Sequence, residues 1–189
     1  MTGRRRPRLR DYFRVTPLSS TDQIAASLWS DVGPGDYAGE SKLAYQAALL
    51  AQYELYVEMA DRVSARRATA NAFFVTLNTG VFALLAGFWE SERSDSTVLL
   101  CVASAALVLQ CLVWFWTLRS YRQLNTAKFA VIGAMERRLP ALPYSDAEWV
   151  ALGEGRDPSR YWPLTRVETA VPLLFALGYL GALVTLLLT

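Results

Sequence analysis

The sequence predicts an all-α integral membrane protein with three transmembrane helices, the first two extended into the cytoplasm as a long antiparallel helical hairpin. Three observations predict this fold. Hydrophobic residues make up 53% of the 189 residues. They gather in blocks that approach or exceed the ~18 apolar residues of a membrane crossing, at residues 71–89, 98–118 and 167–189. Helical spacing of apolar residues also continues before the first block and after the second.

Residues 1–40 are predicted to form a basic, partly disordered N-terminal arm. It is rich in arginine, and no apolar stretch follows the arginines closely, so a cleaved signal is not expected. We interpret the arm as a solvated tail or as a contact to anionic lipid headgroups. Nucleic acid is not expected as a partner, because no basic surface interleaved with aromatic residues follows. Within the arm, residues 20–30 are predicted as a short helix that begins at Ser20 or Thr21.

The first long helix is predicted to begin in water and end in the membrane. Residues 41–70 form its cytoplasmic amphipathic part and residues 71–89 the first crossing. In the cytoplasmic part, aromatic and aliphatic residues recur at spacings of four and three, which places them on one helical face: Tyr45, Leu49, Tyr53, Tyr56, Ala60 and Val63. The stretch from Asn71 to Trp89 has no ionisable side chain. The chain is therefore expected to enter the bilayer there.

The second crossing, residues 98–118, is expected to continue as a cytoplasmic helix up to Pro140. Because the loop between the first two crossings is short, the two long helices should be antiparallel neighbours that pack apolar face to apolar face. Residues 119–166 make up this helix and a capping segment. In that segment, Ser145 and Glu148 match a capping box that would start a short helix. Residues 167–189 form the third crossing.

Charged residues predict the orientation. Basic residues precede the first and third crossings and follow the second, whereas the loop at residues 90–96 carries one arginine against three acidic residues. By the positive-inside bias, the N-terminus is cytoplasmic and the C-terminus lies outside. The residues expected at the membrane interface are Arg66, Arg119, Arg122, Trp114 and Trp116.

Polar residues on the first crossing are the main candidates for a site. Arg67, Asn71 and Asn78 fall within about 40° of one another on a helical projection. One interpretation is that the asparagines bond to Gln110, Ser104 or a neighbouring subunit and fix packing. The other is that they line a water-filled passage in an oligomer, with Arg67 at its cytoplasmic mouth. The opposite side of this helix carries small residues suited to close helix packing: Thr76, Gly80, Ala83 and Gly87.

No pattern in the sequence predicts catalysis. The chain contains no histidine, no phosphate-binding glycine loop and no metal-ligand spacing. We therefore expect neither an enzyme nor a metal or cofactor, and we expect Cys101 and Cys111 to be free. Glu58 and Arg62 are expected to form a surface helix pair. Glu168, at the start of the third crossing, is expected to be an interfacial carboxylate or to pair with a basic residue among Arg119, Arg122 and Arg166.

Two sequence signatures carry a resemblance to a known family. The first is residues 61–67 (DRVSARR), followed by Asn71, Phe73, Phe74 and Asn78, and the second is residues 120–125 (SYRQLN), followed by Lys128, Phe129 and Ile132. Over residues 43–189 the chain resembles the RipA family of small octameric bacterial membrane proteins. The resemblance implies a homo-octamer in the bacterial cytoplasmic membrane. The arginine-rich arm is a departure from the family.

Two hypotheses of function follow. The first is a homo-oligomeric membrane protein with a structural or channel-like role, with itself and membrane lipids as partners. The alternative is a membrane-anchored scaffold or a stress or defence effector. It would bind a partner protein through its cytoplasmic helices and residues 141–162, because exposed loops often carry recognition. A transporter is a weaker possibility, because the crossings show no internal repeat.

Overall fold

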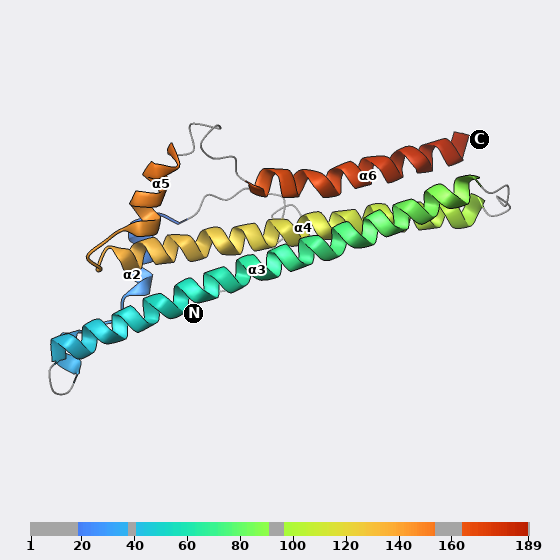
Figure 1. The fold of residues 1–189 in the computed structure, drawn as a ribbon. Helices are drawn as coiled ribbons and strands as arrows, with labels where there is room; N and C mark the ends of the chain where they lie inside the picture. The colour runs from blue at the N-terminus through green and yellow to red at the C-terminus, as the bar shows by residue number, and fades with distance from the viewer. Residues whose placement is uncertain (1–18, 38–40, 91–96, 154–163, 189) are drawn as a thin grey trace.

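The computed structural model describes residues 19–37, 41–90, 97–153 and 164–188 (Figure 1). These residues contain helices and turns but no strand, which confirms the all-α class. The elements are α2 (Thr21–Leu28), the 3₁₀ turn η1 (Pro34–Asp36), α3 (Ser41–Glu90), α4 (Thr97–Glu136), the π turn η2 (Pro143–Ala147), α5 (Glu148–Ala151) and α6 (Leu164–Leu188). Predictions about the arginine-rich arm before residue 19, the loop at 91–96 and residues 154–163 fall outside the described residues.

The two long helices α3 and α4 lie side by side and run in opposite directions (Figure 1). Their contact is built from the face predicted on α3, where Leu49 and Ala60 are buried. On α4 the matching buried residues include Ile132 and Met135. The periodic apolar spacing thus gives each helix a face that is removed from water only when the two helices pack together.

Helix α6 covers one end of this pair, as Figure 1 shows. Its Ala176 and Tyr179 are buried with Leu107 and Cys111 of α4, and Val81 of α3 packs against this cluster. Helix α6 is continuous, with Pro172 inside it and fully buried. The three helices therefore share one core at this end, whereas α3 and α4 continue past α6 at the other end, where α2 and α5 lie (Figure 1).

Two helical stretches are long and apolar enough to cross a membrane: Leu100–Glu136 of α4 and Val167–Leu188 of α6. Less than a quarter of the most apolar stretch of each helix is buried in the single chain, whereas a core helix of a soluble protein is mostly buried. The outer end of the predicted first crossing, at residues 85–90 of α3, includes side chains outside the described set. The three crossings, the cytoplasmic hairpin and the boundaries of the six predicted segments stay predictions.

The short helix α2 confirms the prediction for residues 20–30. Ser20 is its N-cap and forms a capping box with Gln23: the Gln23 N–H donates to Ser20 Oγ at 3.3 Å, and the Ser20 N–H donates to Gln23 Oε1 at 3.1 Å. Trp29 ends the helix, and Arg138 lies over its ring with Cζ 3.5 Å from the centroid. This cation–π contact holds α2 against the end of α4.

Two local predictions at the end of α4 are wrong. The helix ends at Glu136, four residues before Pro140. Pro140 has no N–H to donate to the Glu136 carbonyl, and its ring disfavours helical dihedrals at Leu139. Its last turn tightens instead, since the Leu139 N–H donates to Glu136 O at 2.8 Å. The predicted capping box also fails: Ser145 Oγ donates to the Glu136 carboxylate at 2.7 Å, and the helix begins at Glu148 without a side-chain cap. A charge-assisted bond outweighs a neutral cap.

Candidate functional site

Asn78 lies at the centre of the three-helix core. Asn78 is 0% exposed. The side-chain Nδ2 donates to Phe74 O at 2.8 Å, and Oδ1 accepts from Cys111 Sγ at 3.5 Å. The Asn78 carbonyl oxygen accepts from the Tyr179 hydroxyl at 3.1 Å. Asn78 therefore links α3 to both α4 and α6, through partners other than the predicted Gln110 and Ser104.

Asn71 lies about two turns before Asn78 on the same face of α3. Its Oδ1 accepts from the indole Nε1 of Trp114 at 3.1 Å. Trp114 is buried and stacks on Phe74 with ring centroids 5.6 Å apart. Trp114 was predicted at the membrane interface, but the structure encloses this side chain inside the bundle. Because its indole N–H has a partner there, it needs no headgroup.

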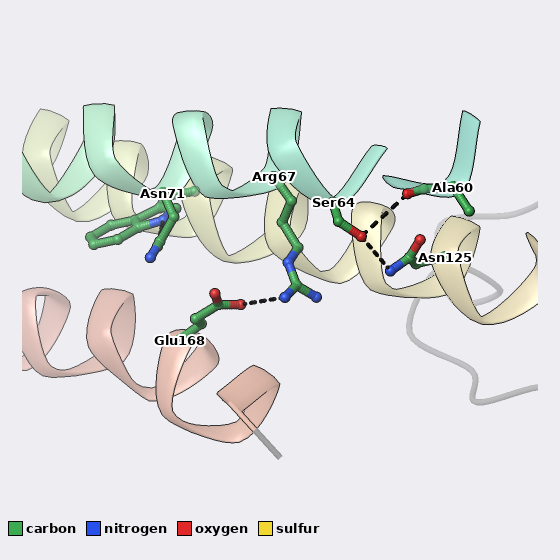
Figure 2. Close-up of polar contacts among 7 residues, drawn as sticks. Ala60, Ser64, Arg67, Asn71, Asn125 and Glu168 are labelled. Carbon is green, nitrogen blue, oxygen red and sulfur yellow. Dashed lines mark hydrogen bonds and ion pairs between the residues drawn. The ribbon is translucent and has the colours of Figure 1, made fainter. Parts of the chain in front are cut away.

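Arg67 forms an ion pair with Glu168 across the start of α6 (Figure 2). The Nη2 to Oε2 distance is 3.3 Å, and the two side chains are only 17% and 13% exposed. Arg67 Nε is buried without a hydrogen-bond partner. The structure thus corrects the predicted partners of Glu168, because the basic residue that reaches it comes from α3. The ion pair joins α3 to α6 at the edge of the apolar core.

Further polar contacts join α3 to α4 next to the ion pair, as Figure 2 shows. Asn125 Nδ2 donates to Ser64 Oγ at 3.0 Å, and Ser64 Oγ donates to Ala60 O at 3.2 Å. Lys128, also buried, places Nζ 4.5 Å from the centroid of the Tyr56 ring. The cation–π contact partly replaces the water that this ammonium group loses.

Glu136 is the buried residue that sequence reasoning missed. It is 0% exposed, and its carboxylate accepts four hydrogen bonds from described residues: Tyr53 Oη at 3.0 Å, Tyr144 N at 3.1 Å, Ser145 N at 2.9 Å and Ser145 Oγ at 2.7 Å. It therefore joins α3, α4 and η2. The available signal was its position four residues after Ile132, on the inward face of α4.

The hydrogen bonds keep the Glu136 carboxylate ionised in spite of burial. Burial by itself raises the pKa of Glu136, but the bonds from Ser145, Tyr144 and Tyr53 outweigh it and lower the pKa below its ordinary value. Conversely, burial and the neighbouring Glu136 carboxylate raise the pKa of Tyr53 to about 12. The phenol thus stays a donor and the carboxylate an acceptor at neutral pH.

The predicted small face of α3 has no neighbour within the described chain. Thr76, Gly80, Ala83 and Gly87 are all exposed. A Cβ atom built on Gly80 or Gly87 would meet nothing within 4 Å. No part of the described chain therefore uses this face for packing, although α4 and α6 both pack on the opposite side of α3.

The remaining predicted residues lie on the outside of the bundle. Arg66 and Arg122 are exposed. Arg119 lies over the Trp116 ring, with Cζ 5.3 Å from the centroid. The predicted pair of Arg62 and Glu58 is confirmed at 2.7 Å. Cys101 and the buried Cys111 are free, as expected. The interface role of these arginines and of Trp116 stays a prediction.

The described residues contain no group of three or more cysteine, aspartate and glutamate side chains that could hold a metal ion.

A family model described as the octameric membrane protein family (8xMP) matches residues 50–188. No curated protein and no solved structure matches the chain. The matched range begins near the start of α3 and includes both α4 and α6, so it takes in every residue of the polar face described above.

Proposed function

The chain belongs to the octameric membrane protein family, and from this premise we propose that it is a homo-octameric structural component of the bacterial cytoplasmic membrane. We assign it no catalytic role. In this proposal α3, α4 and α6 each cross the membrane once, the N-terminus is cytoplasmic and the C-terminus lies outside. The far ends of α3 and α4, with α2 and α5, then form a platform on the cytoplasmic side.

Helix length supports this placement. At about 1.5 Å per residue, α3 is about 75 Å long and α4 about 60 Å, roughly twice the ~30 Å hydrocarbon core. Helix α6 is about 38 Å long, which suits one crossing. The charged and polar contacts of Lys128 and Glu136 lie on α4 beyond the end of α6, where the platform meets water.

The single observation that favours a structural role over a channel is the complete enclosure of Asn78. A passage lined by the polar face of α3 needs this amide in contact with water, but Asn78 is bonded inside one protomer. Asn71 is likewise bonded to Trp114, and Arg67 to Glu168. The three polar residues of the predicted face therefore all form contacts that hold the three helices together.

The test is an image of the detergent-solubilised particle along the membrane normal, paired with ion flux in liposomes. We expect eight copies around one axis and a flux equal to that of empty liposomes. A particle with another number of copies would contradict the octamer. Flux that is abolished by Asn78→Leu and kept by Leu177→Ala, a control on the outward side of α6, would contradict the structural role and support a channel.

A second candidate function is the membrane-anchored scaffold, and one feature of the platform favours it. A pocket of about 330 Å³ lies between α2, α4 and η2, with Ile24, Phe129, Arg137 and Asp146 among its lining residues. Trp149 on the neighbouring α5 is exposed. An open pocket with both apolar and charged walls is a common form of recognition site.

Crosslinking in cells tests the scaffold. The full-length protein and a Trp149→Ser variant are crosslinked, and the products are compared by mass spectrometry. A scaffold predicts a protein crosslinked to α5 or to the pocket that is lost in the variant. Recovery of crosslinks between copies of this chain alone, unchanged by the substitution, would argue against it.

A further inference from the structure

The side of α3 that faces away from α4 and α6 carries an exposed stripe of apolar and small residues, which the exposed Arg62 and Arg66 interrupt. We call the apolar and small residues of this stripe the outer face of α3; they fall within about 120° of one another on a helical projection. They are Leu55, Met59, Ala65, Phe73, Thr76, Gly80, Leu84 and Gly87, and all are exposed. On a helical projection the stripe lies opposite the Asn78 face, and none of the other helices that the structure describes covers it.

Lipid alone does not account for this stripe. From Leu55 to Gly87 it is about 48 Å long, whereas the hydrocarbon core is ~30 Å thick. When Gly80 and Gly87 lie in the bilayer, Leu55 and Met59 lie in water on the other side of the basic residues Arg62 and Arg66. Exposed apolar residues on the water side of these arginines, on the same side of the helix as those in the bilayer, are characteristic of a surface covered by protein.

Helix α4 presents a second exposed face, which we call the outer face of α4: Val102, Leu109, Val113 and Leu124. It points away from α3, because Cys111 and Trp114 on the other side of the helix make the contacts to α3. Its residues are large, whereas Thr76, Gly80 and Gly87 on the outer face of α3 are small. The small residues of the α3 face therefore leave room for large side chains of the α4 face.

The residues also match in level along the bundle. Three contacts set an antiparallel register in which the two residue numbers have a constant sum: Asn78 with Cys111, Ser64 with Asn125 and Tyr53 with Glu136. The same register places each small residue of the α3 outer face at the level of a large residue of the α4 outer face: Ala65 with Leu124, Thr76 with Val113, Gly80 with Leu109 and Gly87 with Val102.

We propose that the outer face of α3 packs against the outer face of α4 of a second copy of this chain. The proposal rests on the octamer proposed above, because a closed ring of identical subunits joins two different faces of each protomer. The two faces lie on opposite sides of the α3–α4 pair, so one copy engages a neighbour on each side. Large side chains of α4 then fill the gaps left by the small residues of α3, as close helix packing in membranes requires.

Disulfide trapping tests the contact in the full-length protein. In a background with Cys101→Ala and Cys111→Ser, the pair Gly80→Cys and Leu109→Cys is introduced and oxidised in membranes. We expect a ladder of crosslinked species up to eight chains on a non-reducing gel, and a single band after reduction. Within one chain the two cysteines lie on opposite outer faces and cannot reach each other.

The matched control pairs Gly80→Cys with Gly181→Cys, another open glycine on the outward side of α6; it should give no ladder. Dimers from Gly80→Cys alone would overturn the proposal in favour of a symmetric α3–α3 contact. A ladder from the control pair but not from Leu109→Cys would also overturn it. The native mass of the unoxidised variants separates the two proposals: eight chains without a ladder refute only this interface, whereas a wild-type particle of another size refutes the octamer.

Discussion

The outer face of α3 and the outward side of α6 are both exposed in one protomer, yet they differ in length and in residue size. The α3 face mixes glycine, alanine and threonine with large residues and is about 48 Å long. The outward side of α6 is mostly large and aliphatic, although Gly181 lies on it, and α6 is only long enough for one crossing. Its exposed residues include Leu173, Leu174, Leu177, Leu180 and Val184.

This difference separates a surface suited to protein from a surface suited to lipid. Lipid tails are as apolar as leucine, so a mostly aliphatic surface gains little from leaving the bilayer. Small residues, in contrast, allow another helix to approach closely, and the exposed Leu55 and Met59 on the water side of Arg62 and Arg66 are stabilised by being covered there. The inward sides of the same helices, joined by Arg67–Glu168 and Asn78–Tyr179, hold the protomer together.

The largest expected effect comes from filling the α3 face. Gly80→Leu adds a large side chain at a position with open space in the protomer, so α3 itself should fold and even gain about 1 kcal/mol of helix propensity. At the proposed subunit contact the side chain has no room, and we expect the octamer to dissociate. Native mass spectrometry measures the loss.

Gly181→Leu is the matched control for this change, because Gly181 is equally open but lies on α6. It should leave the particle mass unchanged. Dissociation caused by Gly181→Leu, with Gly80→Leu still octameric, would reverse the assignment of the two surfaces.

The next largest effect is on the ion pair that joins the two helices. Arg67→Leu leaves the mostly buried Glu168 carboxylate without its cation, which we expect to cost about 3 kcal/mol of unfolding free energy. Thermal unfolding in detergent should show the loss. The double variant with Glu168→Leu should recover most of it, since an apolar pair needs no charge compensation. Equal melting of wild type and Arg67→Leu would show that the pair contributes no stability.

A smaller, pH-dependent effect is expected in the part of the α3–α4 pair that lies beyond α6, where the hydrogen bonds of Glu136 join the helices. Because the folded state lowers the pKa of Glu136, its stabilisation is fully present above the unfolded pKa and is lost as the pH falls through the folded value. Glu136→Gln puts amide hydrogens against existing donors, a cost of about 1–3 kcal/mol at neutral pH. Its melting temperature should approach that of the wild type as the pH falls below 4.5. A difference in melting temperature between the variant and the wild type that stays constant with pH would contradict an ionised Glu136.

The smallest effect is expected from Tyr179→Phe, which removes one hydroxyl from the contact of α6 with α3. The lost bond to the Asn78 carbonyl should cost about 1 kcal/mol, because interhelical hydrogen bonds in membrane proteins contribute little each. Chemical unfolding in mixed micelles measures it. A loss several times larger would mean that this hydroxyl, and not the aromatic packing of Phe175 and Tyr179, holds α6 in place.

Sequence reasoning predicted the helices better than the partners of their polar residues. The spacing of Tyr45, Leu49 and Ala60 predicted the contact face of α3, because periodicity is a local property of one helix. Glu168 was expected near other basic residues, but which cation reaches it depends on how α6 lies across α3. Glu136 was missed, since its donors Tyr53 and Ser145 come from two other elements.

The capping box at Ser145 and Glu148 shows the same limit on a smaller scale. The local pattern was present, as it was at Ser20 and Gln23, where the box does form. At Ser145 a buried carboxylate from α4 offered a stronger acceptor for the hydroxyl hydrogen. A local signal therefore holds only where no tertiary contact competes for the same atoms.

By itself the sequence determined the all-helical class, the approximate extent of the long helices, the membrane character of the chain and, through its two signatures, the octameric family, since each depends on residues close together in the chain. Only the tertiary structure decided that Asn71, Asn78 and Arg67 are bonded within one protomer and that Thr76, Gly80 and Gly87 remain uncovered. The physical reason is that burial and hydrogen bonding are settled between helices, where the register of α3, α4 and α6 selects the partner of each polar group.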